Sequence, residues 1–221
     1  MHQLLMTSSA YRMSVKADAQ ALRTDPDNTL FWRFNLRRLS AEEVRDSILS
    51  VSGSLNLKMF GPSVYPRLPR EVLASQARPG TGWRPSSPEE AARRSVYIHV
   101  KRSLLVPLLA QFDLADTDAS CPVRFTTTVP TQALGMLNGE FTNEQARFLA
   151  ARLRKEAPED FGEQARRAIR LTTGRQPTEE ELRKDVDFFR ALRKEQQLDA
   201  AEALRFYCLM ILNMNEFIYL D

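Results

Sequence analysis

The sequence predicts a mainly α-helical domain with a minor β element and a long loop rich in proline and glycine. Three observations predict this class: apolar residues recur at helical spacing behind capping motifs, one short segment alternates with period two, and prolines and glycines are concentrated between residues 54 and 92. With 221 residues, 43% of them hydrophobic and 27% charged, the chain has a globular composition. We therefore expect one domain over residues 1–221, with residues 54–92 as an irregular insertion.

The N-terminal part predicts two helices. Leu4, Leu5, Met6, Tyr11 and Met13 lie at near-helical spacing, which favours a helix over residues 1–14 that lacks an N-terminal cap. After a turn at residues 25–28, the segment SAEE at residues 40–43 forms a capping box and predicts a helix that runs to residue 51 and stops at Gly53.

The minor β element is expected at residues 95–101. There Val96, Ile98 and Val100 alternate with more polar neighbours, which is typical of a strand. A single strand needs a partner, and residues 123–129, which are rich in threonine, favour extended structure. We expect these two segments to pair.

The C-terminal part predicts a series of helices, each opened by a proline or by a capping residue. The expected helices are 130–137, a helix from Thr142 to about residue 156, one from Asp160 to residue 171, one from Thr178 to about residue 196, and one from Asp199 to residue 213.

Charge is distributed unevenly along the chain. Residues 31–102 contain 13 lysines and arginines against 6 aspartates and glutamates. Arginine suits carboxylate, sulfate and phosphate groups, so this region could bind a polyanion, or it could pair with carboxylates of the chain or of another domain. No nucleic-acid-binding motif accompanies the arginines, so nucleic acid is not expected as a partner. As written, the chain carries no export signal and no stretch long enough for a transmembrane helix.

Six ordered blocks of sequence resemble the planctomycete domain of unknown function 1553, the C-terminal module of large multidomain proteins. They are DPDNTLFWRFNLRRLSAEEVRD at 25–46, RRSVYIHVKRS at 93–103, FDLADTDASCPVRFTTTVPTQALGMLN at 112–138, EQA at 144–146, TGRQPTEEEL at 173–182 and LNMNEFIYLD at 212–221.

The resemblance implies a context rather than a chemistry. In that family the module usually begins earlier, and the proteins commonly carry an export signal, a c-type haem domain and a second domain of unknown function upstream. We therefore expect this chain to be an N-terminally truncated module, with upstream domains of a parent protein as its partners and an exported or periplasmic parent. Any c-type haem is expected in those upstream domains, and no cofactor is expected in this chain.

Several side chains are candidates for catalysis or metal binding. Asp113, Asp116 and Asp118 could offer oxygen ligands to a divalent cation, but we favour turn formation and pairing with Arg124 or Arg102, because turns commonly collect aspartates. His99 could act as a base, and Cys121 as a thiolate. Asp113, Asp116 and His99 would serve a polysaccharide-acting enzyme.

Other side chains are candidates for binding an anionic polysaccharide, because aromatic rings stack on sugars and guanidinium groups pair with acidic substituents. Core packing and internal ion pairs are the alternatives. The candidates are Trp32, Arg33, Arg37, Arg38, Arg93, Arg94 and Arg102. Three hypotheses follow: a non-catalytic structural or interaction module, which we favour, part of a polysaccharide-acting enzyme, or an anionic-glycan-binding module.

Overall fold

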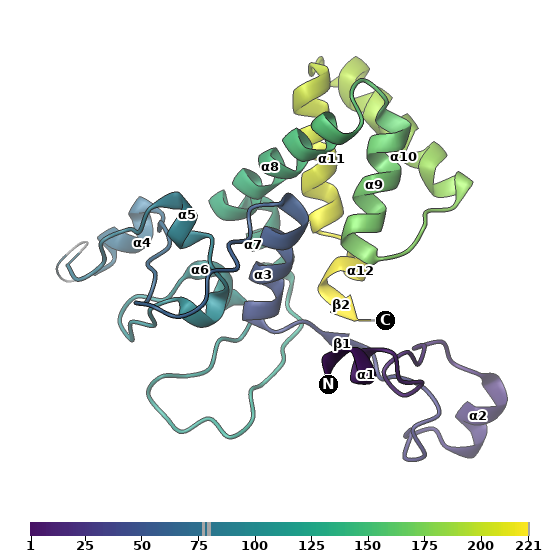
Figure 1. Cartoon of the computed structure of the whole chain (residues 1–221), viewed down its shortest axis with the longest axis horizontal. Coiled ribbons are helices and arrows are strands. Elements are labelled where there is room, and N and C mark those ends of the chain that lie inside the picture. Colours follow the sequence, from purple (N-terminus) through teal and green to yellow (C-terminus); the bar gives the residue numbers. More distant parts are fainter. Residues whose placement is uncertain (77, 79–80, 221) are drawn as a thin grey trace. The chain divides into compact units, whose positions relative to one another are not determined.

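The computed structural model describes residues 1–76, 78 and 81–220. Contacts between residues divide the chain into two compact units, one made of Met1–Arg38 together with the C-terminal residues from Tyr219, the other of Leu39–Ile218. Helices dominate the described residues and the regular strands are very short, so the predicted mainly α class is confirmed (Figure 1). The single-domain organisation stays a prediction.

The smaller unit contains little regular structure. Its helices, α1 (His2–Met6) and α2 (Ala19–Thr24), contain no buried residue. A two-residue strand, β1 (Arg37–Arg38), pairs antiparallel with β2 (Tyr219–Leu220), so that Arg37 lies opposite Leu220. This pairing joins segments from the two ends of the chain, and it is the two-stranded sheet of the described structure.

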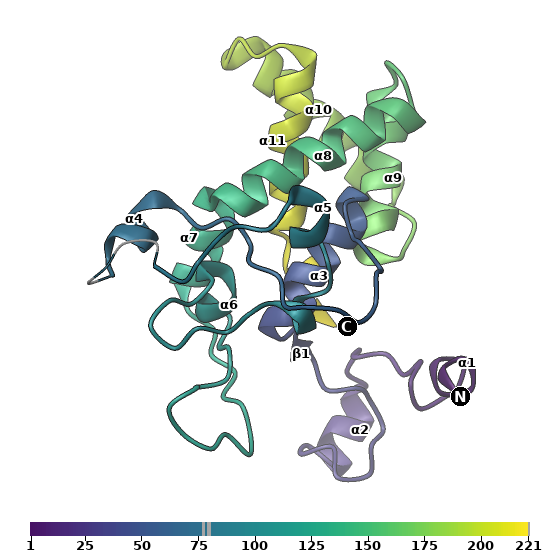
Figure 2. The same cartoon turned by 60° about the vertical axis from the view of Figure 1, so that its left-hand side comes forward.

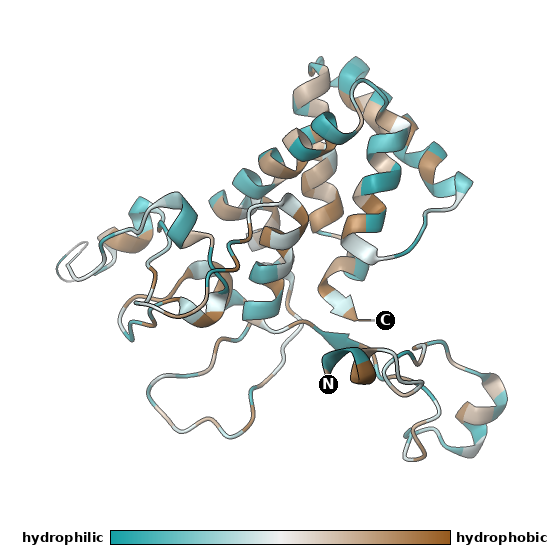
Figure 3. Ribbon diagram, viewed as in Figure 1, coloured by the Kyte–Doolittle hydropathy of each residue, from teal (hydrophilic) through white to brown (hydrophobic). Residues whose placement is uncertain are grey.

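The larger unit is organised around α8 (Glu140–Glu156), which packs against α3 (Ala41–Ser52) and α11 (Ala200–Leu212) (Figure 2). The apolar stripe of α3 faces this core, and α11 is mostly hydrophobic along its length (Figure 3). Burying such side chains stabilises the fold by about 1.5–3 kcal/mol each. Side chains that are fully or almost fully buried include Val44, Ile48, Leu149, Leu153, Leu204, Tyr207 and Leu212.

Two further helices, α9 (Phe161–Thr173) and α10 (Glu179–Glu195), pack beside α11. Phe161 stacks on Phe189 with 3.8 Å between ring centroids, and it meets the edge of Tyr207 at 5.1 Å. The Tyr207 hydroxyl donates a 2.8 Å hydrogen bond to Asp185 on α10. Aromatic contacts and this one polar link therefore join the three helices.

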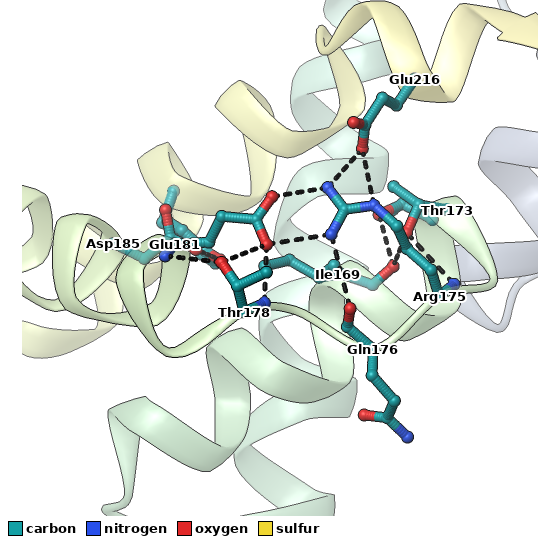
Figure 4. A network of polar contacts seen from close by, with 10 residues as sticks. Ile169, Thr173, Arg175, Gln176, Thr178, Glu181, Asp185 and Glu216 are labelled. Atoms are coloured by element: carbon teal, nitrogen blue, oxygen red, sulfur yellow. Dashed lines mark hydrogen bonds and ion pairs between the residues drawn. The ribbon is translucent and has the colours of Figure 1, made fainter. Parts of the chain in front are cut away.

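Arg175, in the connection between α9 and α10, ties α10 to the short helix α12 (Asn215–Ile218) (Figure 4). Its guanidinium donates to Glu181 at 2.6 Å and to Glu216 at 2.8 Å. The hydrogen bond from Arg175, together with the Thr178 amide, lowers the pKa of Glu181 to about 2. The same glutamate thus completes the capping box of α10 and anchors α12.

Three of the capping predictions for the C-terminal part are confirmed. The side chains of Asp160, Thr178 and Asp199 each accept a hydrogen bond from the amide three residues later, so α9, α10 and α11 begin where expected. The helix α7 (Pro130–Asn138) also begins at its proline. At the end of α3, Gly53 has φ of 79°, the left-handed conformation that glycine adopts without strain.

Two helix predictions need correction. The first helix ends at Met6 rather than near residue 14, because its residues bury nothing and the hydroxyls of Thr7 and Ser8 bond to carbonyls of the preceding turn instead. The helix expected from Thr142 begins at Glu140, directly after Gly139. Thr142 is buried inside α8, so the capping motif read there is wrong.

The predicted strand at 95–101 is wrong. Residues Ser95–Tyr97 form a 3₁₀ turn, η1, and the isolated bridges of this segment join Ile98 to Val64 and Lys101 to Leu104 rather than to residues 123–129. Val64 stands between Pro62 and Pro66, which lack the amide hydrogen that a longer ladder requires. The threonine-rich segment 123–129 forms no strand and is exposed.

Within residues 54–92 the described part of the chain contains two short helices, α4 (Arg70–Ala74) and α5 (Pro88–Ala91), and its assignment as an insertion stays a prediction. It continues into η1 and α6 (Pro107–Gln111). Trp83, Leu68 and Leu104 form a small buried cluster of their own. None of the helices in the described part of the chain is long and apolar enough to cross a membrane.

Candidate functional site

The loop-rich region at 54–106 is fastened to α3 by Arg45 and Asp46. The buried Arg45 donates to the carbonyls of Arg93 and Ala91 at 3.0 and 2.6 Å. Asp46 accepts hydrogen bonds from the amide and hydroxyl of Ser95, at 2.8 and 2.6 Å. Burial lowers the pKa of Arg45 to about 10, so this side chain still carries its charge at neutral pH.

Arg93 performs a similar task within the region. Its side chain is fully buried and donates to the carbonyls of Lys58 and Pro62, each at 3.2 Å, and to that of Phe60. The guanidinium also lies 3.9 Å from the ring centroid of Tyr97. Arg93, a candidate for binding an anionic ligand, therefore directs its donors at the chain itself.

His99 lies in an aromatic cluster. Its ring centroid is 4.8 Å from that of Tyr65 and 6.4 Å from that of Trp83, whose indole nitrogen donates to the Pro66 carbonyl at 2.9 Å. A cavity of about 330 Å³ is lined by Tyr65, Gly82, Trp83 and Arg84. The cluster gives His99 aromatic neighbours and places a guanidinium-bearing residue at a hollow beside them.

The three candidate metal ligands make contacts within and around their own loop, 113–129. Asp113 accepts hydrogen bonds from the Thr127 amide and hydroxyl at 2.8 and 3.0 Å. Asp116 accepts from the amide of Asp118, and Asp118 pairs with Arg102. Among the described residues, no three His, Cys, Asp or Glu side chains are grouped so that they could hold a metal ion.

This loop, between α6 and α7, extends away from the helices of its unit (Figures 1 and 2). All of residues 116–131 are exposed, including Cys121, and Val123 and Phe125 are 77% and 85% exposed. Gln132 closes the neck by donating to the Gln111 carbonyl at 2.9 Å. The loop is thus fixed at its base, and its Arg124 pairs with Glu42 of α3 at 2.6 Å. Its exposed apolar side chains include Val123 and Phe125.

The remaining basic candidates are dispersed. In the smaller unit, the Arg33 guanidinium lies 5.0 Å from the Trp32 ring centroid, and the Trp32 indole donates to the Asp25 carbonyl at 2.9 Å. Arg37 and Arg38 form β1, Arg37 exposed and Arg38 buried. In the larger unit, Arg94 is exposed and lies 3.8 Å from Asp46.

In the smaller unit, Asp25 and Asn28 organise a hydrogen-bonded turn. Asp25 accepts from the Leu30 amide at 2.7 Å and from the Thr29 amide at 2.9 Å, and these hydrogen bonds, that of Leu30 above all, lower its pKa. The Asn28 side chain donates to the Arg33 carbonyl at 2.8 Å. Hydrogen bonds within residues 25–35 therefore stabilise this turn, and Phe31 in it is 75% exposed.

Comparison with models of known protein families identifies the family of this chain. The model of the family described as Protein of unknown function (DUF1553), PSD1, matches residues 1–189. The chain belongs to the DUF1553 family. No curated protein and no solved structure matches this DUF1553 chain.

Sequence reasoning missed the residues of this DUF1553 structure that fasten the loop-rich region to α3 and that line the cavity beside His99. Arg45 and Asp46 lie beside the apolar stripe of α3, and they contact residues some 50 positions later in the chain. Tyr65 and Trp83 stand among prolines and glycines, where a large aromatic ring must find burial through contacts that no local pattern specifies. The sequence signal that could have identified them was the occurrence of large aromatic residues in a proline-rich segment.

Proposed function

We propose that this DUF1553 chain is a non-catalytic structural or interaction module that packs against other domains of a larger exported, cytochrome c-associated protein. One observation supports the proposal above the rest: the loop 113–129 is closed at its neck by hydrogen bonds yet exposes Val123 and Phe125 almost completely. Apolar side chains on a pre-ordered segment bind a partner with a smaller loss of conformational entropy.

Internal contacts of the polar candidates also favour a module. Asp113 and Asp118 engage Thr127 and Arg102, and His99 lies against Tyr65. An enzyme part would instead draw on groups that converge on a substrate. A haem would belong to the parent protein, because Cys121 and Cys208 of this chain are not part of a CxxCH attachment motif.

The test is co-purification. An upstream domain of the proposed parent protein is co-expressed with the tagged chain, as wild type and as Phe125→Asp. We expect the wild type to retain this domain and Phe125→Asp to retain at least about tenfold less of it, since a charge replaces a ring that the contact would bury. Leu134→Asp, on the exposed side of α7 with 55% exposure, is the matched control. Equal retention by wild type and Phe125→Asp would refute the proposal.

A second candidate, binding of an anionic glycan, is supported by the hollow lined by Tyr65, Trp83 and Arg84. Two aromatic residues and an arginine line it, which is a combination suited to an acidic sugar. Titration with polygalacturonate should show binding that weakens with salt and with Arg84→Gln, while Arg67→Gln, another exposed arginine of the same region, binds as wild type. Equal binding of a neutral glucan would exclude this candidate.

A further inference from the structure

Three neighbouring apolar side chains of the loop-rich region are turned out of the fold. Leu57, Met59 and Phe60 are 71%, 62% and 77% exposed. Together with Lys58 they form a contiguous segment, called here the 57–60 tip. Such a row of large exposed apolar side chains is unusual in a soluble domain and indicates a contact surface.

The backbone of the 57–60 tip is held by the fold. The buried Arg93 donates to the carbonyls of Lys58, Phe60 and Pro62. The Phe60 amide donates to the Tyr97 hydroxyl at 2.9 Å, and the Lys58 amide to the Asn56 side chain at 2.9 Å. Phe60 itself has φ of 64°, a conformation that non-glycine residues rarely adopt. Arg93 and Tyr97 thus fix a strained turn whose apolar side chains remain outside.

These backbone groups of the 57–60 tip already have hydrogen-bond partners inside the protein, and this bears on whether the tip binds a lipid surface or a protein. A polar backbone group that enters hydrocarbon without a hydrogen bond is costly, whereas one already bonded inside the protein can approach lipid. A groove on a protein partner could supply the missing hydrogen bonds itself. The bonding by Arg93 and Tyr97 therefore favours a lipid surface over a protein groove.

The charge around the 57–60 tip favours an anionic lipid. Residues 54–102 contain nine lysines and arginines against three glutamates. Of these glutamates, Glu90 is neutralised by Lys58 at 2.5 Å and by Arg93 at 3.4 Å. Lys58 and Arg94, although they pair with Glu90 and Asp46, keep 55% and 57% of their side chains exposed. Cations beside an apolar segment strengthen its adsorption to a negatively charged bilayer.

We propose that the 57–60 tip inserts into the interfacial region of an anionic lipid bilayer and makes this chain a peripheral membrane-binding protein. The inference is independent of the proposed module function, which uses the loop 113–129. Insertion buries Leu57, Met59 and Phe60, while Lys58, which lies within the tip and is 55% exposed, faces the lipid headgroups.

Vesicle sedimentation tests the inference with the whole chain. The probes are phosphatidylcholine vesicles with and without roughly 30% phosphatidylglycerol, at about 0.1 M and about 0.5 M salt. We expect binding to the anionic vesicles only, weaker at the higher salt. Phe60→Asp and, as a second variant, Leu57→Asp should each lower the partition coefficient about tenfold or more. Phe125→Asp is matched in residue type and exposure and should bind as wild type.

Three outcomes would overturn the inference: no binding of the wild type to anionic vesicles, unchanged binding of both tip variants, or an equal loss with Phe125→Asp. Loss of self-association by Phe60→Asp in the absence of vesicles, seen in sedimentation velocity, would assign the tip to a protein contact instead. Retained thermal unfolding by at least one tip variant shows that the loss is not misfolding. Co-purification with Phe125→Asp tests the loop 113–129, whereas vesicle sedimentation tests the 57–60 tip. Either proposal can therefore fail without the other.

Discussion

Arg93 and Arg94 are adjacent, yet they lie in opposite surroundings. Arg93 is fully buried and donates to three backbone carbonyls, whereas the Arg94 side chain is 57% exposed. Arg93→Met should leave those carbonyls without donors and lower the free energy of unfolding by about 3 kcal/mol, measured by urea denaturation. Arg94→Met is the control and should change it by no more than about 0.5 kcal/mol. Equal losses for the two variants would contradict the role given to Arg93.

Glu181 makes the free energy of unfolding of the chain depend on pH in the acidic range. Its pKa is about 2 in the folded chain against an ordinary value of 4.5, so its contribution is present above about pH 4.5 and is lost as the pH falls toward 2. The side chain is 35% exposed, so solvent screening keeps this contribution modest. Glu181→Gln should be less stable than wild type at about pH 6, and the difference should shrink by about pH 3.

The control for this titration lies one residue away. Glu180, 64% exposed, pairs with Lys184 on the solvent side of α10. Glu180→Gln should follow the wild type across the same pH range within about 0.5 kcal/mol. A difference between wild type and Glu181→Gln that does not change with pH would show that the Arg175 network leaves the titration of Glu181 unaltered.

Residue-scale predictions from sequence succeed where the partner is a few positions away. The caps at Asp160, Thr178 and Asp199 bond to amides three residues later, and a local motif is enough to identify them. Arg93 binds carbonyls more than 30 residues earlier, so nothing beside it in the sequence distinguishes it from Arg94. The grouping of arginines was visible, but the separation of buried from exposed ones was not.

At the scale of elements, the loop 113–129 depends on its neck. Thr127→Val removes the hydroxyl and keeps the side-chain shape, so Asp113 loses one of its donors. We expect trypsin to cleave at Arg124 several times faster in this variant, with little change in the free energy of unfolding, because the loop buries almost nothing. Thr126→Val, one residue away and equally exposed, is the control. Unchanged cleavage of Thr127→Val would show that the neck does not order the loop.

Elements also show why the β prediction failed while most helices were found. Long amphipathic segments such as residues 179–195 define a helix by their own periodicity and caps. The alternation at 95–101 lacks a partner strand, because Pro62 and Pro66 flank the Val64 bridge and prevent a ladder. Of the candidate site residues, His99 was found without its aromatic neighbours, since Tyr65 and Trp83 come from distant loop positions.

At the scale of the whole molecule, the two units should differ in local stability. α1 and α2 contain no buried residue, whereas α8 and α11 supply much of the core. Hydrogen exchange measured by mass spectrometry should therefore label residues 2–24 within seconds and protect α8 and α11 by several orders of magnitude. Comparable protection of α1 and α8 would contradict this division.

The central claim, that the loop 113–129 is a contact surface for another domain, is tested most directly by hydrogen exchange on that loop. The exchange of residues 116–131 is compared in the chain alone and in complex with an upstream domain of the proposed parent protein, with the exposed tip of residues 57–60 as an internal reference. The account predicts that the complex slows exchange in 116–131 about tenfold or more and leaves 57–60 unchanged. Unchanged exchange in 116–131 within a stable complex would contradict it.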